Sequence, residues 1–286
     1  MKVSEIYKSG RKSLSFEIFP PKKDEELKSI DETLEVLGEL NPDFISVTFG
    51  AGGSANCNKT IELAKKIKED YNIEPVVHLT CIHYDVNEID RFTEELKDSG
   101  IENILALRGD VREDIPRKED FSYASDLVTH LKEDSDFCVL GACYPERHPE
   151  SANMVDEIKH LKAKVNAGTD VLLSQLFFDN SCFYEFEERC KIADINVPVI
   201  PGIMPVVKAS QIKRMISMCN ASFPERFQKI VDKYENNKEA LFDAGMAYAI
   251  SQIIDLLACN TEGIHLYTMN NPVIARRICE GIKNIV

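Results

Sequence analysis

Polar and ionisable residues recur in this chain at the ends of short apolar runs, an arrangement that could bring them together at one site. They are Glu17, Thr48, His78, Arg108 with Asp110, Tyr144, Gln175 and Thr268. Because the carboxyl ends of parallel strands meet at one face of a barrel or sheet, we expect these side chains to lie close together. The run that ends in PGIMP (201–205) is the exception and offers mostly backbone groups. Strands that only build a core have no need of ionisable groups at so many ends, so the pattern indicates an active site.

Glu17 stands inside an otherwise apolar run, SFEIFPP (15–21). A carboxyl group on a strand face lined by aromatic rings would lose its hydration, which favours the protonated form that a general acid needs. Alternatively, Glu17 faces outward between two core residues, and alternation along the run does not distinguish the two orientations. Pro20 and Pro21 end the strand, so Glu17 is close to the rim in either case.

The run LRGD (107–110) ends a strand with charges of both signs and a glycine. An arginine suits a phosphate or a carboxylate, and a glycine lets a ligand approach the backbone. The alternative is a simple surface ion pair between Arg108 and Asp110. The loop YPERHPE (144–150) is also rich in titratable groups, although a single histidine such as His148 is more typical of a solvated loop.

A glycine-rich run, TFGAGG (48–53), follows a strand and could cradle a phosphate or a flat ring. It matches neither of the common glycine-rich nucleotide motifs, so taken alone it is a weak nucleotide signal. Gln175 could hydrogen-bond a heterocycle, whereas Phe177 and Phe178 are expected to supply core. There is no strand-borne lysine in a clear Schiff-base position, which argues against a class I aldolase. Since no paired cluster of His, Asp or Glu is present, no metal site is predicted.

Eight apolar, strand-like segments alternate with helical patterns along the chain. The predicted strands are Leu14–Phe19, Phe44–Phe49, Pro75–Cys81, Asn103–Arg108, Phe137–Tyr144, Val171–Phe178, Val197–Met204 and Gly263–Thr268. Helices are predicted over 85–99 and 153–167, where apolar residues recur at spacings of three and four. A last helix is expected to open with Asn271 as its capping residue and Pro272 at its first position.

This rhythm of about 36 residues per unit predicts a (β/α)8 TIM barrel over the 286 residues. Residues 205–262 form an extra, mostly helical stretch, so additional helices are expected before the last strand. No linker or low-complexity tract divides the chain, and residues 1–286 are therefore predicted to form a single domain. A doubly wound open sheet is the structural alternative.

Composition limits the classes of partner. The net charge of −14 makes nucleic acid or an anionic membrane a poor partner, because phosphate binding needs a basic face. No stretch approaches the ~20 apolar residues of a membrane helix, and the amino terminus lacks the features of a secretory signal. The nine cysteines form no CxxC pair, so we expect reduced, mostly buried thiols and a cytoplasmic protein.

Ten short motifs occur in one order along the chain and together resemble the catalytic barrel of the methylenetetrahydrofolate reductase family. They are FEIFPP, DFISVTFGAGG, HLTC, LALRGD, YASDLV, YPERHPE, LKAKVNAG, SQLFFD, IPGIMPV and HLYTMN. The resemblance runs from about Ser13 to Cys279, nearly the whole chain. By this resemblance the chain is expected to be the short bacterial form, without a regulatory extension after the barrel.

The resemblance implies FAD at the carboxyl face of the barrel and a ping-pong hydride transfer. A donor reduces the flavin and leaves, and 5,10-methylenetetrahydrofolate then stacks on the same ring and is reduced to 5-methyltetrahydrofolate. Glu17 matches the catalytic acid, which assists opening of the substrate's five-membered ring to an iminium. Asp110 matches the carboxylate near the flavin, whose negative charge disfavours an anionic reduced flavin and favours the cationic iminium.

Further positions are implied in the same way. Those that match flavin-contacting positions are Thr48, Phe49, Ala51, His78, Arg108, Gly109, Asp110, Ala124, Tyr144, His148, Ser151, Glu157, His160 and Lys164. Those that match substrate-contacting positions are Glu17, Thr48, Gln175, Gln211 and Asn271. Glu157, His160 and Lys164 are spaced by three and four, which places them on one face of the helix over 153–167.

The chain departs from the family pattern at four of these or neighbouring positions. Ala163 replaces an arginine near the FAD phosphates, and Glu157 replaces an aspartate. Asn271 stands where an arginine can meet the folate tail, and Met215 where a phenylalanine can stack on the donor. The electron donor is therefore left open between NADH, NADPH and a partner subunit of an electron-transfer assembly. A flavin-free, folate-binding methyltransferase is the other alternative, and a homo-oligomer is expected.

Overall fold

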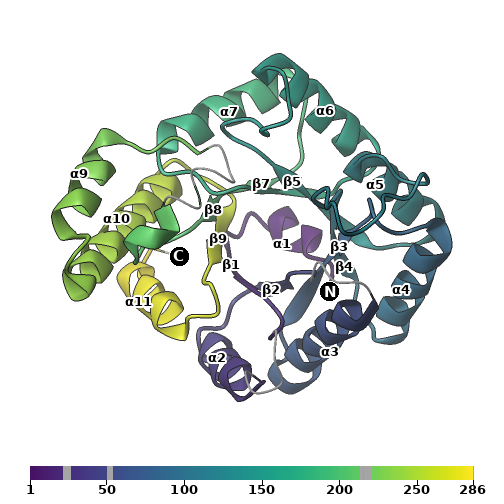
Figure 1. Cartoon of the computed structure of the whole chain (residues 1–286), viewed down its shortest axis with the longest axis horizontal. Coiled ribbons are helices and arrows are strands. Elements are labelled where there is room, and N and C mark those ends of the chain that lie inside the picture. The colour runs from purple at the N-terminus through teal and green to yellow at the C-terminus, as the bar shows by residue number, and fades with distance from the viewer. Residues whose placement is uncertain (22–26, 50–53, 213–214, 216–220, 286) are drawn as a thin grey trace.

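The structure is a computed structural model that describes residues 1–21, 27–49, 54–212, 215 and 221–285. Its centre is a barrel of parallel strands surrounded by helices (Figure 1). The strands are β1 (Ser13–Ile18), β2 (Phe44–Val47), β3 (Glu74–Thr80), β4 (Asn103–Leu107), β5 (Cys138–Cys143), β6 (Val171–Ser174), β7 (Val199–Ile200), β8 (Gly202–Ile203) and β9 (Gly263–Tyr267). The eight predicted strands are confirmed, and one of them is divided into β7 and β8.

The division of that strand at Pro201 explains how the barrel closes. The strand order is β7-β6-β5-β4-β3-β2-β1-β9-β8, and every pairing is parallel. Pro201 has no N–H to donate, but its carbonyl accepts from the N–H of His265 at 3.0 Å. β7 pairs with β6 and β8 pairs with β9, so one interrupted strand joins both ends of the sheet. The fold is therefore the predicted barrel and not the doubly wound alternative.

Helices cover the outside of the barrel. They are α2 (Leu27–Glu39), α3 (Ser54–Tyr71), α4 (Val86–Asp98), α5 (Ala124–Asp134), α6 (Met154–Asn166), α7 (Asn180–Ile192), α9 (Glu225–Tyr234), α10 (Lys238–Ala258) and α11 (Pro272–Ile282). The predicted starts are confirmed by their caps. Asp85 and Glu88 form a capping box before α4, and the side chains of Asn153 and Asn271 accept backbone N–H groups of α6 and α11.

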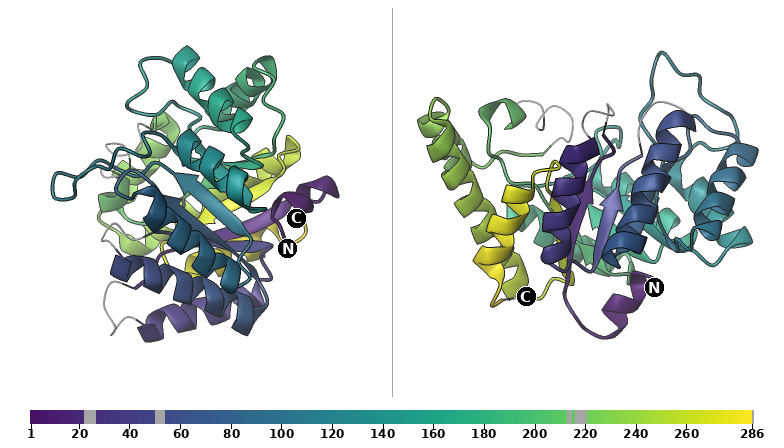
Figure 2. Two further views of the ribbon diagram at one scale, coloured as in Figure 1. Left: turned by 90° about the vertical axis from the view of Figure 1, so that its right-hand side faces the viewer. Right: turned by 90° about the horizontal axis from the view of Figure 1, so that it is seen from below.

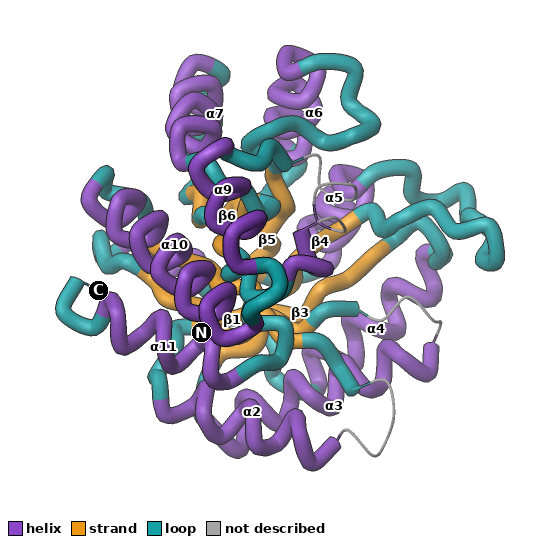
Figure 3. The backbone as a smooth tube through the Cα atoms, turned by 60° about the vertical axis from the view of Figure 1, so that its left-hand side comes forward, coloured by secondary structure: helices purple, strands orange, loops and turns teal. Residues whose placement is uncertain are grey.

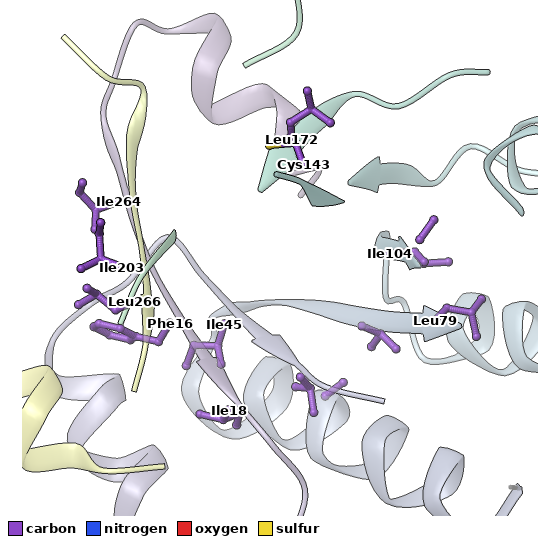
Figure 4. Packing of buried hydrophobic residues seen from close by; sticks show 14 of the residues in the cluster. Phe16, Ile18, Ile45, Leu79, Ile104, Cys143, Leu172, Ile203, Ile264 and Leu266 are labelled. Carbon is purple, nitrogen blue, oxygen red and sulfur yellow. The ribbon is translucent and has the colours of Figure 1, made fainter. Parts of the chain in front are cut away.

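Two apolar layers result from the alternation of side chains along the strands. Phe16, Ile18 and Ile45 point outward and pack beneath the helices (Figure 4). Phe44 belongs to a separate cluster inside the barrel, together with Leu140 and other inward residues. The outer face of the strands is thus apolar, and the interior is filled by apolar side chains together with polar ones such as Ser15 on β1.

A short helix that precedes the first strand, α1 (Ser4–Lys8), closes the amino end of the barrel (Figure 2). Val3, Ile6 and Tyr7 pack in the interior cluster. Asn103, fully buried at the start of β4, accepts from the N–H of Val3 at 2.7 Å and donates to the carbonyl of Met1 at 3.1 Å. Since this end is plugged, a ligand reaches the interior from the carboxyl end of the strands.

The extra helices expected before the last strand are α9 and α10, on the outside of the barrel (Figure 3); α10 lies between α9 and α11. α10 is the one helix of the described chain long and apolar enough to cross a membrane, with a mean hydropathy of 1.3 over its most apolar window. It packs against α7, α9 and α11, and 44% of that window is buried. Its apolar composition is therefore explained by packing in the core.

Two further expectations can be compared with the structure. The strand predicted over 171–178 ends at Ser174, because Phe177 and Phe178 leave the barrel and are buried beside α7 and α9. As expected, these two residues supply core.

All described cysteines are free, and Cys81, Cys138, Cys143 and Cys190 are buried, which agrees with the expected thiols. Cys57 and Cys219 lie where side chains are not described.

Candidate active site

The orientation of Glu17 is settled by the register of β1. Phe16 and Ile18 pack in the outer layer, so Glu17 faces the barrel interior. Its Oε2 atom lies 3.5 Å from Nε2 of His78 on β3, and its side chain is 22% exposed. Glu17 is therefore an inward carboxyl group that retains access to the mouth of the barrel, and the outward alternative is wrong.

His78 is the nearest ionisable neighbour of that carboxyl group. Its side chain is buried, and its Nε2 atom has no hydrogen-bond partner among the described residues. Burial lowers the pKa of His78 from 6.5 to about 4, and the nearby Glu17 offsets only part of this effect. His78 is accordingly a neutral imidazole at pH 7.

A second imidazole, which was not predicted from the sequence, lies in the same place. His265 on β9 is fully buried, and its Nε2 lies 3.9 Å from Oε2 of Glu17. Its Nδ1 lies 2.8 Å from Oγ of Ser15, its register partner on β1, and its Nε2 lies 3.5 Å from Oγ of Ser46. The available signal was a histidine within the apolar run GIHLY, but His265 lies inside this run and not at its end, and its partners are distant in sequence.

Other predicted strand-end residues surround this centre. The Thr268 hydroxyl, fully buried, donates to the carbonyl of Glu17 at 2.9 Å and therefore fixes the backbone. Thr48 is half-buried just past β2, and Gln175, half-buried past β6, accepts from the N–H of Leu176. Phe49 packs against Tyr84 and Phe92 beneath α4.

Arg108 and its neighbours form the rim beyond β4. Both Nη atoms of Arg108 donate to Glu150, at 2.5 and 2.8 Å, so its carboxylate partner is Glu150 and not Asp110. These hydrogen bonds raise the pKa of the Arg108 guanidinium. Gly109 has a φ of +88°, and a Cβ there would lie 3.1 Å from Cβ of Thr80. Asp110 is exposed, and its carbonyl lies 3.0 Å from Nε2 of His83.

The loop after β5 is held by a buried carboxylate on α6. Oε2 of Glu157 accepts from the N–H of His148 at 3.1 Å and from the hydroxyl of Ser151 at 2.6 Å. The rings of Tyr144 and His148 meet edge to face at 4.7 Å. Burial lowers the pKa of His148 and raises that of Tyr144. The loop is thus ordered by its own polar contacts beside Arg108.

The other two predicted residues of α6 differ in environment. Nζ of Lys164 donates to the carbonyl of Ala142 on β5 at 2.7 Å, and burial lowers its pKa. A Cβ at Gly141 would lie 3.1 Å from Cδ of Lys164, so this glycine leaves room for the lysine. His160 is exposed. Lys164 therefore reaches beneath the helix to the strand ends, whereas His160 stays at the surface.

The comparisons with known proteins cover nearly the whole chain. The sequence model of the methylenetetrahydrofolate reductase family matches residues 2–283. The chain belongs to this family. It is 35% identical over 273 residues to 5,10-methylenetetrahydrofolate reductase of Escherichia coli, covering 96% of this chain and 91% of that protein. The resemblance predicted from the ten motifs is confirmed.

Plant members of the methylenetetrahydrofolate reductase family are longer. The chain is 32% identical over 288 residues to methylenetetrahydrofolate reductase (NADH) 1 of Arabidopsis thaliana, covering 94% of this chain but only 48% of the plant protein. It thus spans about half the length of these relatives. Among solved structures, a Clostridium thermocellum protein described as binding two copies of 5-methyl-5,6,7,8-tetrahydrofolic acid superposes with a TM-score of 0.66 at 15% identity, over 99% of both chains. At that identity the likeness concerns the fold.

The remaining residues implied by the family pattern have local roles in the structure. Oε1 of Gln211 accepts from the N–H groups of Val207 and Lys208, and Asn271 caps α11. Ala124 is buried at the start of α5, and Ala51 lies outside the described residues.

Of the two further departures from the methylenetetrahydrofolate reductase pattern, Ala163 is exposed on α6. Met215 is buried, at 8% exposure, in a cluster with Phe178 and Ile212. Among the described residues, no group of three or more His, Cys, Asp or Glu could hold a metal ion.

Proposed function

We propose that this chain reduces 5,10-methylenetetrahydrofolate to 5-methyltetrahydrofolate with FAD as its cofactor. The observation that carries the proposal is the inward Glu17 carboxyl group, 3.5 Å from the neutral imidazole of His78. A partly buried carboxyl group beside a neutral base, at the open end of a plugged barrel, has the surroundings of a general acid. Membership of the methylenetetrahydrofolate reductase family supplies the reaction class.

The residues present on one side of the rim fit an anionic dinucleotide. Arg108 and Lys164 bring two cations to the ends of β4 and β5, in a chain whose net charge is −14. His148 and Ser151 lie in the adjoining loop, ordered by Glu157. Local cations of this kind are what a phosphate needs in an acidic protein. We therefore assign the phosphates of FAD to this side and the flavin ring to the strand ends near His78, Gly109 and Asp110.

When bound, FAD supplies the hydride that the folate accepts. Glu17 donates its proton to the nitrogen that leaves when the five-membered ring opens. The bond between this nitrogen and the bridging carbon breaks. The bridging carbon remains on the other nitrogen as an iminium, which the hydride converts to a methyl group. The negative charge of Asp110 favours this cationic iminium. One proton and one hydride are thus consumed for each folate reduced.

The identity of the electron donor is also proposed. NADH or NADPH is the first candidate, and a partner subunit is the second. The second rests on Met215, which is buried and presents no aromatic ring to a nicotinamide. The isolated protein, loaded with FAD, should be mixed anaerobically with NADH, NADPH and reduced ferredoxin in turn.

Bleaching of the flavin by NADH or NADPH, followed by its return on addition of 5,10-methylenetetrahydrofolate, is expected. Bleaching by ferredoxin alone would favour the partner subunit. A protein that takes up no FAD would contradict the proposed function and favour a flavin-free methyltransferase.

A further inference from the structure

Beneath Glu17, the barrel interior contains a polar cluster made by His265, Ser15 and Ser46. All three side chains are fully buried. They come from β9, β1 and β2, which are neighbours in the sheet. The interior cluster below and beside them is apolar and includes Phe44, whose ring stacks on His265 at 5.9 Å. An imidazole is costly to bury there unless its nitrogen atoms have partners.

The two nitrogen atoms of His265 differ in their surroundings. Nδ1 lies 2.8 Å from Oγ of Ser15, and that hydroxyl also donates to the carbonyl of Ile264 at 3.3 Å. We assign the proton to Nδ1, because the Ser15 hydroxyl can then accept from the imidazole while it donates to the carbonyl of Ile264. In the neutral ring, Nε2 is then a proton acceptor.

Nε2 of His265 faces the carboxyl group of Glu17. Its distances are 3.9 Å to Oε2 of Glu17 and 3.5 Å to Oγ of Ser46, both longer than a good hydrogen bond. An approach of about 1 Å would bring Oε2 and Nε2 to hydrogen-bond distance. The carboxyl group and the imidazole can then hold a proton in either of two ways, as a neutral acid beside a neutral base or as an ion pair.

We propose that His265 is the proton-sharing partner of Glu17, acting through that residue on the folate reaction. The inference rests on the proposed function. Before folate reacts, the pair holds one proton between Oε2 and Nε2, in addition to the proton on Nδ1. When Glu17 gives a proton to the departing nitrogen, the pair is left as a carboxylate and a neutral imidazole. It takes up one proton from solvent before the next turnover, so the balance of one proton per folate is kept.

The other groups that face the pair do not take this role. Among the described residues, His78 from β3 is the one further imidazole paired with Glu17, and burial keeps it neutral because its pKa falls to about 4. The hydroxyl of Tyr267, whose ring meets His265 edge to face, donates to the carbonyl of Ser174. Ser15 and Ser46 supply hydroxyls, and Phe44 a ring. His265 is therefore the base available to share the proton.

The first test needs neither folate nor flavin turnover. The chain has six histidines, so long-range proton–nitrogen NMR spectra of the imidazoles can be followed against pH in the full chain. The His265 signals are assigned with His265→Gln, and the wild type is compared with Glu17→Gln. We expect His265 to take up its second proton at a pH at least one unit higher in the wild type, a tenfold difference in proton affinity. Equal titration in both proteins would overturn the inference.

His130 provides the matched control for the spectra. Its Nε2 lies 2.7 Å from Asp90 on the outer side of the barrel, far from Glu17. Its titration should be the same in wild type and Glu17→Gln, and a change there would mean that the substitution acts through the whole fold and not through a shared proton. Because this test needs no folate chemistry, it can succeed even where the proposed function fails.

The second test uses the FAD-loaded protein. In His265→Gln, the rate of flavin reoxidation by 5,10-methylenetetrahydrofolate should fall off at a pH about one unit lower than in the wild type, because the proton is no longer shared. Flavin reduction by the donor should change by less than about twofold. His130→Gln should show the wild-type profile. An unshifted profile in His265→Gln, or equal losses in both half-reactions, would assign His265 a structural role instead.

Discussion

Arg108 and Glu150 are joined by two hydrogen bonds across the loops that follow β4 and β5, at 2.5 and 2.8 Å. The two side chains are 21% and 58% exposed, so the pair adds little to stability. Its effect is geometric, because it holds the guanidinium at the rim where we place the FAD phosphates. A phosphate that binds Arg108 must share it with, or displace, the carboxylate of Glu150.

Substitutions in this pair should act on FAD affinity in opposite directions. Arg108→Gln removes a charge-assisted hydrogen bond, worth about 1.5–3 kcal/mol, and should weaken FAD binding tenfold or more. Glu150→Gln removes a competing negative charge and should tighten binding several-fold. Both can be measured by titrating the flavin-free protein with FAD. Glu185→Gln, which breaks a similar pair with Arg189 on α7, is the control. Weaker binding by Glu150→Gln would mean that Glu150 positions Arg108 for the cofactor.

Asp110 should tune the flavin electrostatically. It is exposed and follows Gly109, where the backbone turns with a positive φ at the rim. Asp110→Asn removes a negative charge and should raise the flavin reduction potential and slow the folate half-reaction. Equilibration with a redox dye measures the first effect and stopped-flow absorbance the second. Asp114→Asn, in an exposed pair with Arg112, should change neither. An unchanged potential in Asp110→Asn would remove the electrostatic argument.

His78 should make the protein less stable in mild acid. Its pKa is about 4 in the folded chain and 6.5 in the unfolded chain, so between these values the unfolded state binds more protons. Stability therefore falls as the pH is lowered through this window, by about 2 kcal/mol between pH 7 and pH 5. Urea unfolding at both pH values should show a smaller loss in His78→Gln than in the wild type. His130→Gln should keep the wild-type difference, and an equal loss in all three proteins would contradict the prediction.

The plug formed by α1 should depend on Asn103. Its side chain bonds to Val3, Met1 and Pro75, with all partners at the amino end of the barrel. Asn103→Ala leaves the buried N–H of Val3 without its acceptor and should cost about 2–4 kcal/mol. Denaturant unfolding measures this cost. Asn196→Ala, at an exposed turn, is the control and should cost less than about 0.5 kcal/mol. Equal stability of the two variants would show that α1 is held by apolar packing alone.

The barrel could be predicted because strands and helices alternate with one period over the whole chain. The interruption at Pro201 and the early end of β6 at Ser174 could not, since the apolar runs continue past both points. The five residues of α1 are too few to show helical periodicity. Their plugging role appears only when Asn103 is brought to them across about one hundred residues.

The site was predicted less completely, and for a related reason. Ser15 and Glu17 alternate with apolar residues along β1, but alternation alone does not tell which face of a strand is the interior of the barrel. The packing of Phe16 and Ile18 beneath the helices decides this, and Glu17 lies 3.5 Å from His78. His265 was missed because its partners, Ser15 and Ser46, lie 250 and 219 residues away in sequence. An ion pair between Arg108 and Asp110 was one of the two expectations. In the structure, Arg108 instead donates to Glu150, which lies in the loop after β5.

The role of Glu17 is tested most directly by separating the two half-reactions in Glu17→Gln under anaerobic conditions. The account predicts that the donor reduces the FAD of this variant at nearly the wild-type rate. Reoxidation by 5,10-methylenetetrahydrofolate should be slower by about a hundredfold or more, the contribution of a general acid. Wild-type reoxidation, or equal loss of both half-reactions, would contradict the assignment of Glu17 as the acid of the folate reaction.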